Sequence, residues 1–172
     1  MDGPAAGPNI SFVSPHVAAI HDYWLNLRGA REAPGRQEID PADMPRLSLP
    51  YVLIVDLLYQ PFRARYRLVG THCVSIYGSD YTGLFLDQLV IPESVRVQIH
   101  EDYLRVATSR RSVVSIYNWQ RLTGDEAIAE YAIMPIVSDG IVSQCLVAEH
   151  ISYKGAVFPI AGLVDEPDGL ME

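Results

Sequence analysis

The chain has little of what would mark it for export, for a membrane or for disulfide bonding. It contains two cysteines outside any CxxC pair, and its apolar runs fall far short of the roughly 20 residues that span a membrane. Its first residues form neither the basic region nor the apolar region of a secretory signal. We therefore expect a soluble cytoplasmic protein without membrane contact, in which Cys73 and Cys145 are buried, reduced thiols.

Catalytic signatures are also absent from the sequence. The chain has no glycine-rich phosphate loop, no GxSxG and no HExxH. Glu101 and Asp102 are adjacent on a predicted helix, so their side chains diverge and we expect two solvated charges rather than a catalytic pair. The sequence therefore does not predict an enzyme.

Positive charge is scarce and is carried almost entirely by arginine. One lysine is present, and 21 acidic residues against 13 basic ones give a net charge of −8. Such a chain is repelled by nucleic acids unless one face concentrates its basic groups. One predicted strand carries an alternating stripe of three arginines, too few for a nucleic-acid site: Arg63, Arg65 and Arg67. The stripe either docks a partner's carboxylates or pairs within the chain's own sheet, where the candidates are Asp56, Glu130 and Glu149.

The periodicity of apolar residues predicts one α+β domain. Ser14-Pro15 forms an N-cap and first helical position, apolar residues follow at helical spacing, and Gly29 ends this helix. Strands are predicted at 51–58 and 63–70, a short helix at 71–77, a long helix from 92 to about 110, and strands at 112–119, 127–137 and 143–152. The last two turns are predicted at 123–125 and 138–140. We expect a flexible arm at 1–13, a domain at 14–153 with its N-terminal helix at 14–28, and a tail at 154–172.

These elements predict a five-stranded antiparallel sheet with helices inserted between its second and third strands. Gly70 is expected to let the backbone bend at the end of the second strand, and Thr71 to cap the short helix. Gly78 and Gly83 are expected to allow tight reversals. The inserted segment then forms the wall of a cup over the concave face.

The predicted lining of this cup is mostly apolar, with a few tyrosine hydroxyls and one histidine. Such a lining suits a small amphipathic ligand, and it equally describes a filled core whose hydroxyls find backbone partners. Both interpretations stay open. The lining residues are Tyr66, Leu68, His72, Cys73, Ile76, Tyr77, Phe85, Leu86, Tyr103, Val106 and Ile116.

Short motifs in the chain resemble a bacterial PAS-like family found mainly in alphaproteobacteria. They are Arg65-Tyr66-Arg67-Leu68-Val69-Gly70-Thr71, Tyr77-Gly78-Ser79-Asp80-Tyr81-Thr82-Gly83, His21-Asp22-Tyr23-Trp24, Arg28-Gly29, Ile39-Asp40-Pro41 and Pro45. The resemblance covers about residues 14 to 153. It implies a sensory or protein-interaction module, often a dimer through the N-terminal helix, and it carries over no catalytic residue.

The N-terminal helix carries an apolar stripe with two aromatic side chains. The stripe suits the core of a homodimer interface, and the alternative is packing on the chain's own sheet. Its residues are Val17, Ile20, Tyr23, Trp24 and Leu27.

The sequence identifies no cofactor and no metal site. Haem would need an axial histidine, and the candidates are His72, at the start of the short helix, and His100, on the flank of the long one. Cys73-Val74-Ser75 does not resemble the cysteine context of a flavin photoadduct.

We therefore expect a stand-alone PAS-like regulatory domain that binds a small ligand in its cup, a partner protein, or both, and signals in trans to a separate effector protein. One alternative is a ligand-free interaction scaffold. The other is a small cone-shaped α+β enzyme similar to the nuclear-transport-factor-like isomerases, which would need a buried acid.

Overall fold

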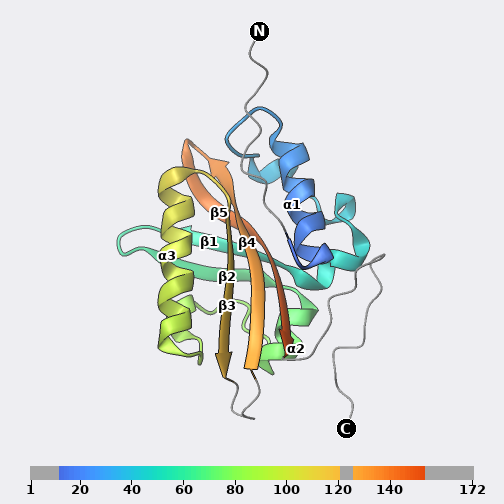
Figure 1. Ribbon diagram of the computed structural model, residues 1–172. Coiled ribbons are helices and arrows are strands. Elements are labelled where there is room, and N and C mark those ends of the chain that lie inside the picture. The colour runs from blue at the N-terminus through green and yellow to red at the C-terminus, as the bar shows by residue number, and fades with distance from the viewer. Residues whose placement is uncertain (1–11, 121–125, 154–172) are drawn as a thin grey trace.

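The computed structural model describes residues 12–120 and 126–153. The predicted arm and tail lie largely outside these residues, as does the predicted turn at 123–125. Within them the chain forms one five-stranded antiparallel sheet covered by helices on both sides (Figure 1). The strands are β1 (Val52–Leu58), β2 (Arg63–Val69), β3 (Val113–Gln120), β4 (Glu126–Ser138) and β5 (Ile141–Tyr153). The helices are α1 (Pro15–Arg28), α2 (Thr71–Tyr77) and α3 (Glu93–Ser109), and the short 3-10 turns are η1 (Arg36–Glu38), η2 (Pro41–Asp43), η3 (Arg46–Tyr51) and η4 (Leu86–Gln88).

The spatial order of the strands is β2-β1-β5-β4-β3, so the first and last strands pair at the centre of the sheet. The α+β prediction is confirmed, including the helices between β2 and β3. The predicted turn between β4 and β5 is present, with Asp139 and Gly140 both at positive φ. Because α3 follows β2 rather than preceding the sheet, the order of elements does not match the isomerase-like alternative.

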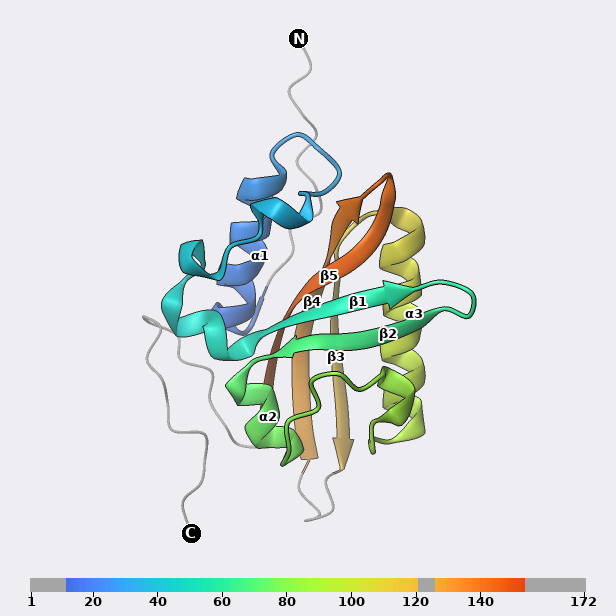
Figure 2. The same ribbon diagram turned by 180° about the vertical axis from the view of Figure 1, so that it is seen from behind.

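The two faces of the sheet carry separate cores. On the inner face, which we define as the face covered by α2, η4 and α3, one core contains Val55, Tyr103 and Val147. On the outer face, the opposite side, a second core beneath α1 contains Trp24, Ile54 and Leu146. Figure 2 shows α1 and α3 on opposite sides of the strands. Within the described residues, no helix is long and apolar enough to cross a lipid bilayer.

Helix α1 is anchored to the outer face of its own sheet. Ser14 is its N-cap, as predicted, and the buried Glu130 on β4 accepts hydrogen bonds from the backbone N–H groups of Val13 (2.8 Å) and Ser14 (3.0 Å). A carboxylate at this end of a helix is favoured by the helix dipole. Trp24 donates its Nε1–H to the carbonyl oxygen of Pro135 at 2.9 Å.

This packing answers the question left open for the apolar stripe of α1. Val17, Ile20 and Trp24 are at most 2% exposed and belong to the outer core, while Tyr23 and Leu27 are half-buried. The three buried side chains pack within the chain and offer no surface to a second copy, while an interface through the half-buried Tyr23 and Leu27 stays a prediction. Intrachain packing, the alternative, describes this helix.

Gly70 has a different role from the one predicted. Its φ of −65° is available to any residue, but a Cβ at this position would lie 2.1 Å from the carbonyl oxygen of Pro50. Glycine is required here because two backbone segments approach closely. Gly70, not Thr71, is the N-cap of α2, and Gly78 ends this helix in the left-handed conformation, as predicted.

A bulge interrupts the predicted alternation of β2. Ile54 pairs with Leu68 and the next residue, Val55, pairs with Tyr66, so Arg67 is an extra residue in the ladder. The predicted inward orientation is therefore confirmed for the side chain of Tyr66, but it is wrong for Leu68, whose side chain is 42% exposed.

Candidate functional site

A set of buried tyrosines lines the inner face of the sheet. They come from β2, the segment after α2, α3, β3 and β4, and their rings meet at right or steep angles. The ring centroids are 4.9 Å apart for Tyr66 and Tyr81 and 5.1 Å apart for Tyr117 and Tyr131. We call these residues the tyrosine cluster: Tyr66, Tyr81, Tyr103, Tyr117 and Tyr131.

Glu149 on β5 places a carboxylate among these rings. Tyr117 donates its hydroxyl hydrogen to Oε1 of Glu149 at 2.5 Å, and Sγ of Cys73 lies 4.0 Å from Oε2. Among residues 12–120 and 126–153, no arginine, lysine or histidine forms an ion pair with this carboxylate. Burial raises the pKa of Glu149, and the hydrogen bond from Tyr117 offsets part of that effect. Within the described residues, the inner face thus contains a half-buried carboxylate that no neighbouring cation pairs with.

Asp102 on α3 is a second carboxylate on the inner face, and it is fully paired. It accepts hydrogen bonds from the hydroxyls of Ser115 (2.8 Å) and Tyr131, and Arg105 lies 3.2 Å from its Oδ1. The expectation of a solvated charge is wrong for Asp102, which is 2% exposed, because the helix turns it toward β3 and β4. Glu101 is exposed, as expected. Asp102 therefore anchors α3 to the sheet.

The structure brings together part of the predicted lining. Tyr66, Cys73, Leu86, Tyr103 and Val106 are buried in the inner core, and Ile76 and Tyr77 are half-buried against it. Half-buried Phe85 lies beneath the guanidinium of Arg63, whose carbon is 3.5 Å from the ring centroid. The expected inward orientation is wrong for Leu68 and for Ile116, which is 57% exposed.

The register of β3 explains the error at Ile116. Ser115 and Tyr117 face α3 and Glu149, so the neighbouring Ile116 points to the opposite side. The predicted lining also lacks Tyr81, Tyr117, Tyr131 and Glu149. The two-residue spacing of Ser115 and Tyr117 indicates that both face the same side of β3. β5 mixes apolar and polar residues on both faces and gives no such signal for Glu149.

Buried histidines form a separate cluster where α1, η3, α2 and β5 meet. Tyr51 stacks on His16 with ring centroids 3.9 Å apart, and lies 4.4 Å from the ring of His72 and 4.8 Å from that of His150. Nδ1 of His150 shares a 2.8 Å hydrogen bond with the hydroxyl of Ser14. We call His16, Tyr51, His72 and His150 the histidine cluster.

His72 therefore does not join the tyrosine cluster. Its Nε2 accepts a hydrogen bond from the backbone N–H of Ile151 at 3.1 Å, so this nitrogen already has a protein donor and is poorly placed to bind haem iron. His100 packs its ring edge-on against Phe62, with centroids 5.5 Å apart. In the described part of the chain, no three histidine, cysteine or acidic residues are grouped to hold a metal ion.

Both cysteines and the arginine stripe have clear structural roles. Cys73 and Cys145 are buried, unbridged thiols, as predicted. In the stripe, Arg65 and Arg67 pair with Asp56, one of the three candidates, at 2.7 and 3.7 Å. The remaining arginine, Arg63, binds Asp87 on η4. The other two candidates do not pair with the stripe: Glu130 binds the start of α1, and Glu149 binds Tyr117 on the inner face.

Comparisons with known proteins agree with this architecture. A family model described as the PAS domain matches residues 13–147, which is most of the 172-residue chain. A search of curated proteins found no match.

Proposed function

Because the chain belongs to the PAS domain family, we propose that it is a sensory and protein-interaction domain whose signal is a small molecule bound at Glu149 and the tyrosine cluster. The single observation that carries this proposal is the carboxylate of Glu149. It lies among aromatic rings on the inner face, and no cation of the described residues pairs with it. Glu149 is half-buried, and an unpaired carboxylate among buried rings is typical of a functional site.

The chemistry of this site favours a ligand with a cationic or hydrogen-bond-donor group on an apolar body. Glu149 would accept from the donor group, and the faces of Tyr66 and Tyr81 would attract a positive charge. Apolar neighbours such as Val106 and Val147 would contact the remainder of the molecule. The contacts on this face therefore favour small amphipathic amines over anions.

The residues after Glu149 supply a route from the ligand to the outer face. His150 points to the opposite side of β5, where it contacts Ser14 at the start of α1, and the N–H of Ile151 binds His72 on α2. A ligand that shifts this part of β5 would alter both helices. The ligand can bias the helices only by the difference between its affinities for the two arrangements. A partner protein would respond to the altered surface, and a homodimer is one form that this interaction could take.

Native mass spectrometry of the protein purified from its own host tests the proposal. We expect a retained small molecule in the wild-type protein and at least a tenfold lower occupancy in Glu149→Gln, which keeps the side-chain shape but removes the charge. Glu101→Gln, an exposed carboxylate on α3, is the matched control and should retain the molecule. Equal retention in Glu149→Gln and the wild type would show that the ligand binds elsewhere.

The same measurement addresses the ligand-free scaffold. That alternative predicts a mass equal to the polypeptide alone together with a co-purifying protein. A co-purifying protein that is retained equally by the wild type and Glu149→Gln, with no small molecule in either, would favour the scaffold and refute the ligand site.

A further inference from the structure

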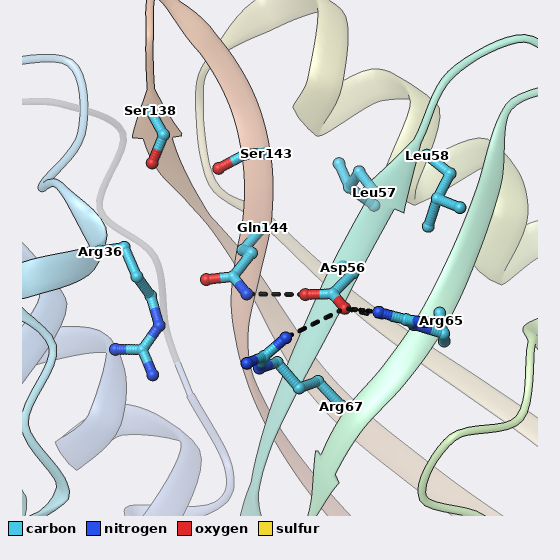
Figure 3. Close-up of a pocket in the computed structure, with 9 residues that line it drawn as sticks. All are labelled: Arg36, Asp56, Leu57, Leu58, Arg65, Arg67, Ser138, Ser143 and Gln144. Atoms are coloured by element: carbon cyan, nitrogen blue, oxygen red, sulfur yellow. Dashed lines mark hydrogen bonds and ion pairs between the residues drawn. The ribbon is translucent and has the colours of Figure 1, made fainter.

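The outer face of the sheet contains an open pocket away from the inner site. It has a volume of about 440 Å³, within the range of small-molecule sites. Its walls come from η1, β1, β2 and β5 (Figure 3). The polar groups that line it include Arg36, Asp56, Arg65, Arg67, Ser143 and Gln144.

The pocket carries more positive than negative charge although the chain is acidic overall. Three arginines line it against one carboxylate, that of Asp56, in a protein of net charge −8. Within the described residues, Arg36 has no carboxylate partner, and its NH1 group donates only to the carbonyl oxygen of Ile39 at 3.2 Å. Arg36 approaches from η1, on the opposite side of the pocket from the strand that carries Arg65 and Arg67 (Figure 3).

Both carboxylate oxygens of Asp56 already accept hydrogen bonds from neighbouring side chains. Its Oδ2 accepts from NH2 of Arg65 at 2.7 Å, and its Oδ1 accepts from Nε2 of Gln144 at 2.6 Å. Burial alone would raise the pKa of Asp56, but these hydrogen bonds and the charges of Arg65 and Arg67 outweigh it, so the pKa is lowered. Asp56 therefore stays ionised and neutralises one arginine, chiefly Arg65.

The second guanidinium of β2 is held only loosely. Arg67 lies 3.7 Å from Oδ2 of Asp56, its side chain is 58% exposed, and it occupies the bulge of β2. Exposed ion pairs of this kind contribute little stability. Arg36 and Arg67 thus leave about two positive charges without full compensation in one concave site.

A second observation also indicates a missing partner. Because Nε2 of Gln144 is fixed on Asp56, its Oε1 is directed away from that carboxylate (Figure 3). This oxygen is buried and has no hydrogen-bond partner in the described structure. An unsatisfied buried acceptor is unfavourable by about 1–3 kcal/mol, and a donor on a bound molecule would relieve it.

We propose that this pocket binds a small dianion that carries a hydroxyl group, such as hydrogen phosphate or a hydroxylated dicarboxylate, between the guanidinium groups of Arg36 and Arg67, with the hydroxyl donating to Oε1 of Gln144. Arginine forms paired N–H···O bonds with both kinds of anion. Asp56 and Gln144 hold Arg65 in place as the fixed wall of the site. Arg65 and Arg67 flank Tyr66 in β2, but their side chains line the outer pocket, so the proposal does not depend on the inner-face ligand.

Isothermal titration of the purified protein tests this site with two probes that each carry a hydroxyl donor, inorganic phosphate and malate, at constant ionic strength. We expect saturable binding of at least one probe by the wild type and at least fivefold weaker binding by Arg36→Gln and by Arg67→Gln. Arg96→Gln is the control, because Arg96 is an arginine on α3 outside the pocket, and it should bind as the wild type does.

Three results would overturn the proposal. One is the absence of saturable binding of both probes, and another is equal weakening by Arg67→Gln and Arg96→Gln, which would indicate a non-specific charge effect. The third is binding of an acidic peptide through Arg36 and Arg67 when neither small dianion binds, which would identify a docking surface for a protein instead. Thermal unfolding of each variant verifies that it is folded before titration.

Discussion

Acidification from pH 7 to pH 5 is expected to destabilise the domain through His150. Burial, and then the neighbouring His72 and His16, lowers the pKa of His150 to about 3 in the folded protein. In the unfolded chain a histidine titrates near pH 6.5. Between these values the unfolded chain binds a proton that the folded chain does not, so stability is lost as the pH falls through this window and is retained above it.

The size of the effect follows from the two pKa values. At pH 5 the folded protein still holds His150 neutral, while nearly every unfolded chain carries the proton. The resulting loss of unfolding free energy between pH 7 and pH 5 is about 2 kcal/mol for this one residue. Burial also lowers the pKa of His21, which adds a loss of the same sign.

Urea unfolding at the two pH values, followed by circular dichroism, measures this loss. Comparison with His150→Gln isolates the contribution of His150, because the effect of His21 is common to both proteins. The loss between pH 7 and pH 5 should be about 2 kcal/mol smaller in the variant. An identical loss in both proteins would show that His150 is not held neutral by its surroundings.

Three substitutions test the packing of the fold by the same unfolding measurement at pH 7. Gly70→Ala should destabilise by about 3 kcal/mol, because the new Cβ meets the carbonyl oxygen of Pro50; a loss below about 0.5 kcal/mol would contradict that close approach. Trp24→Phe should cost about 1–3 kcal/mol by leaving the Pro135 carbonyl without its donor, and a neutral result would mean that water replaces the indole. Leu146→Ala should cost about 2–5 kcal/mol from the outer core, and a smaller loss would indicate that the core collapses around the cavity.

Local signals in the sequence were sufficient for most of the fold. The Ser14-Pro15 start of α1, the glycine stop of α2 at Gly78 and the β4–β5 turn depend on neighbouring residues alone, and each is present. The order of the elements then limited the topology to a small number of arrangements. Contacts between distant segments were not predictable in this way, because the need for glycine at position 70 arises from Pro50, twenty residues earlier.

The candidate site was harder to predict from the sequence, because it too depends on contacts between distant segments. The bulge at Arg67 depends on how β2 pairs with β1, and it moves Leu68 to the solvent side. β5 mixes apolar and polar residues on both faces, so periodicity could not assign Glu149 to the inner face. The burial of Asp102 was not predictable from α3 alone, because its partners Ser115 and Tyr131 lie on β3 and β4.

The most direct test of the central claim is a crystal structure of the protein purified from its own host. The account predicts electron density for a small molecule on the inner face, with a donor group within hydrogen-bond distance of the carboxylate of Glu149. Density for a co-purified molecule elsewhere, with the inner face filled only by the tyrosine cluster and its neighbours, would contradict it.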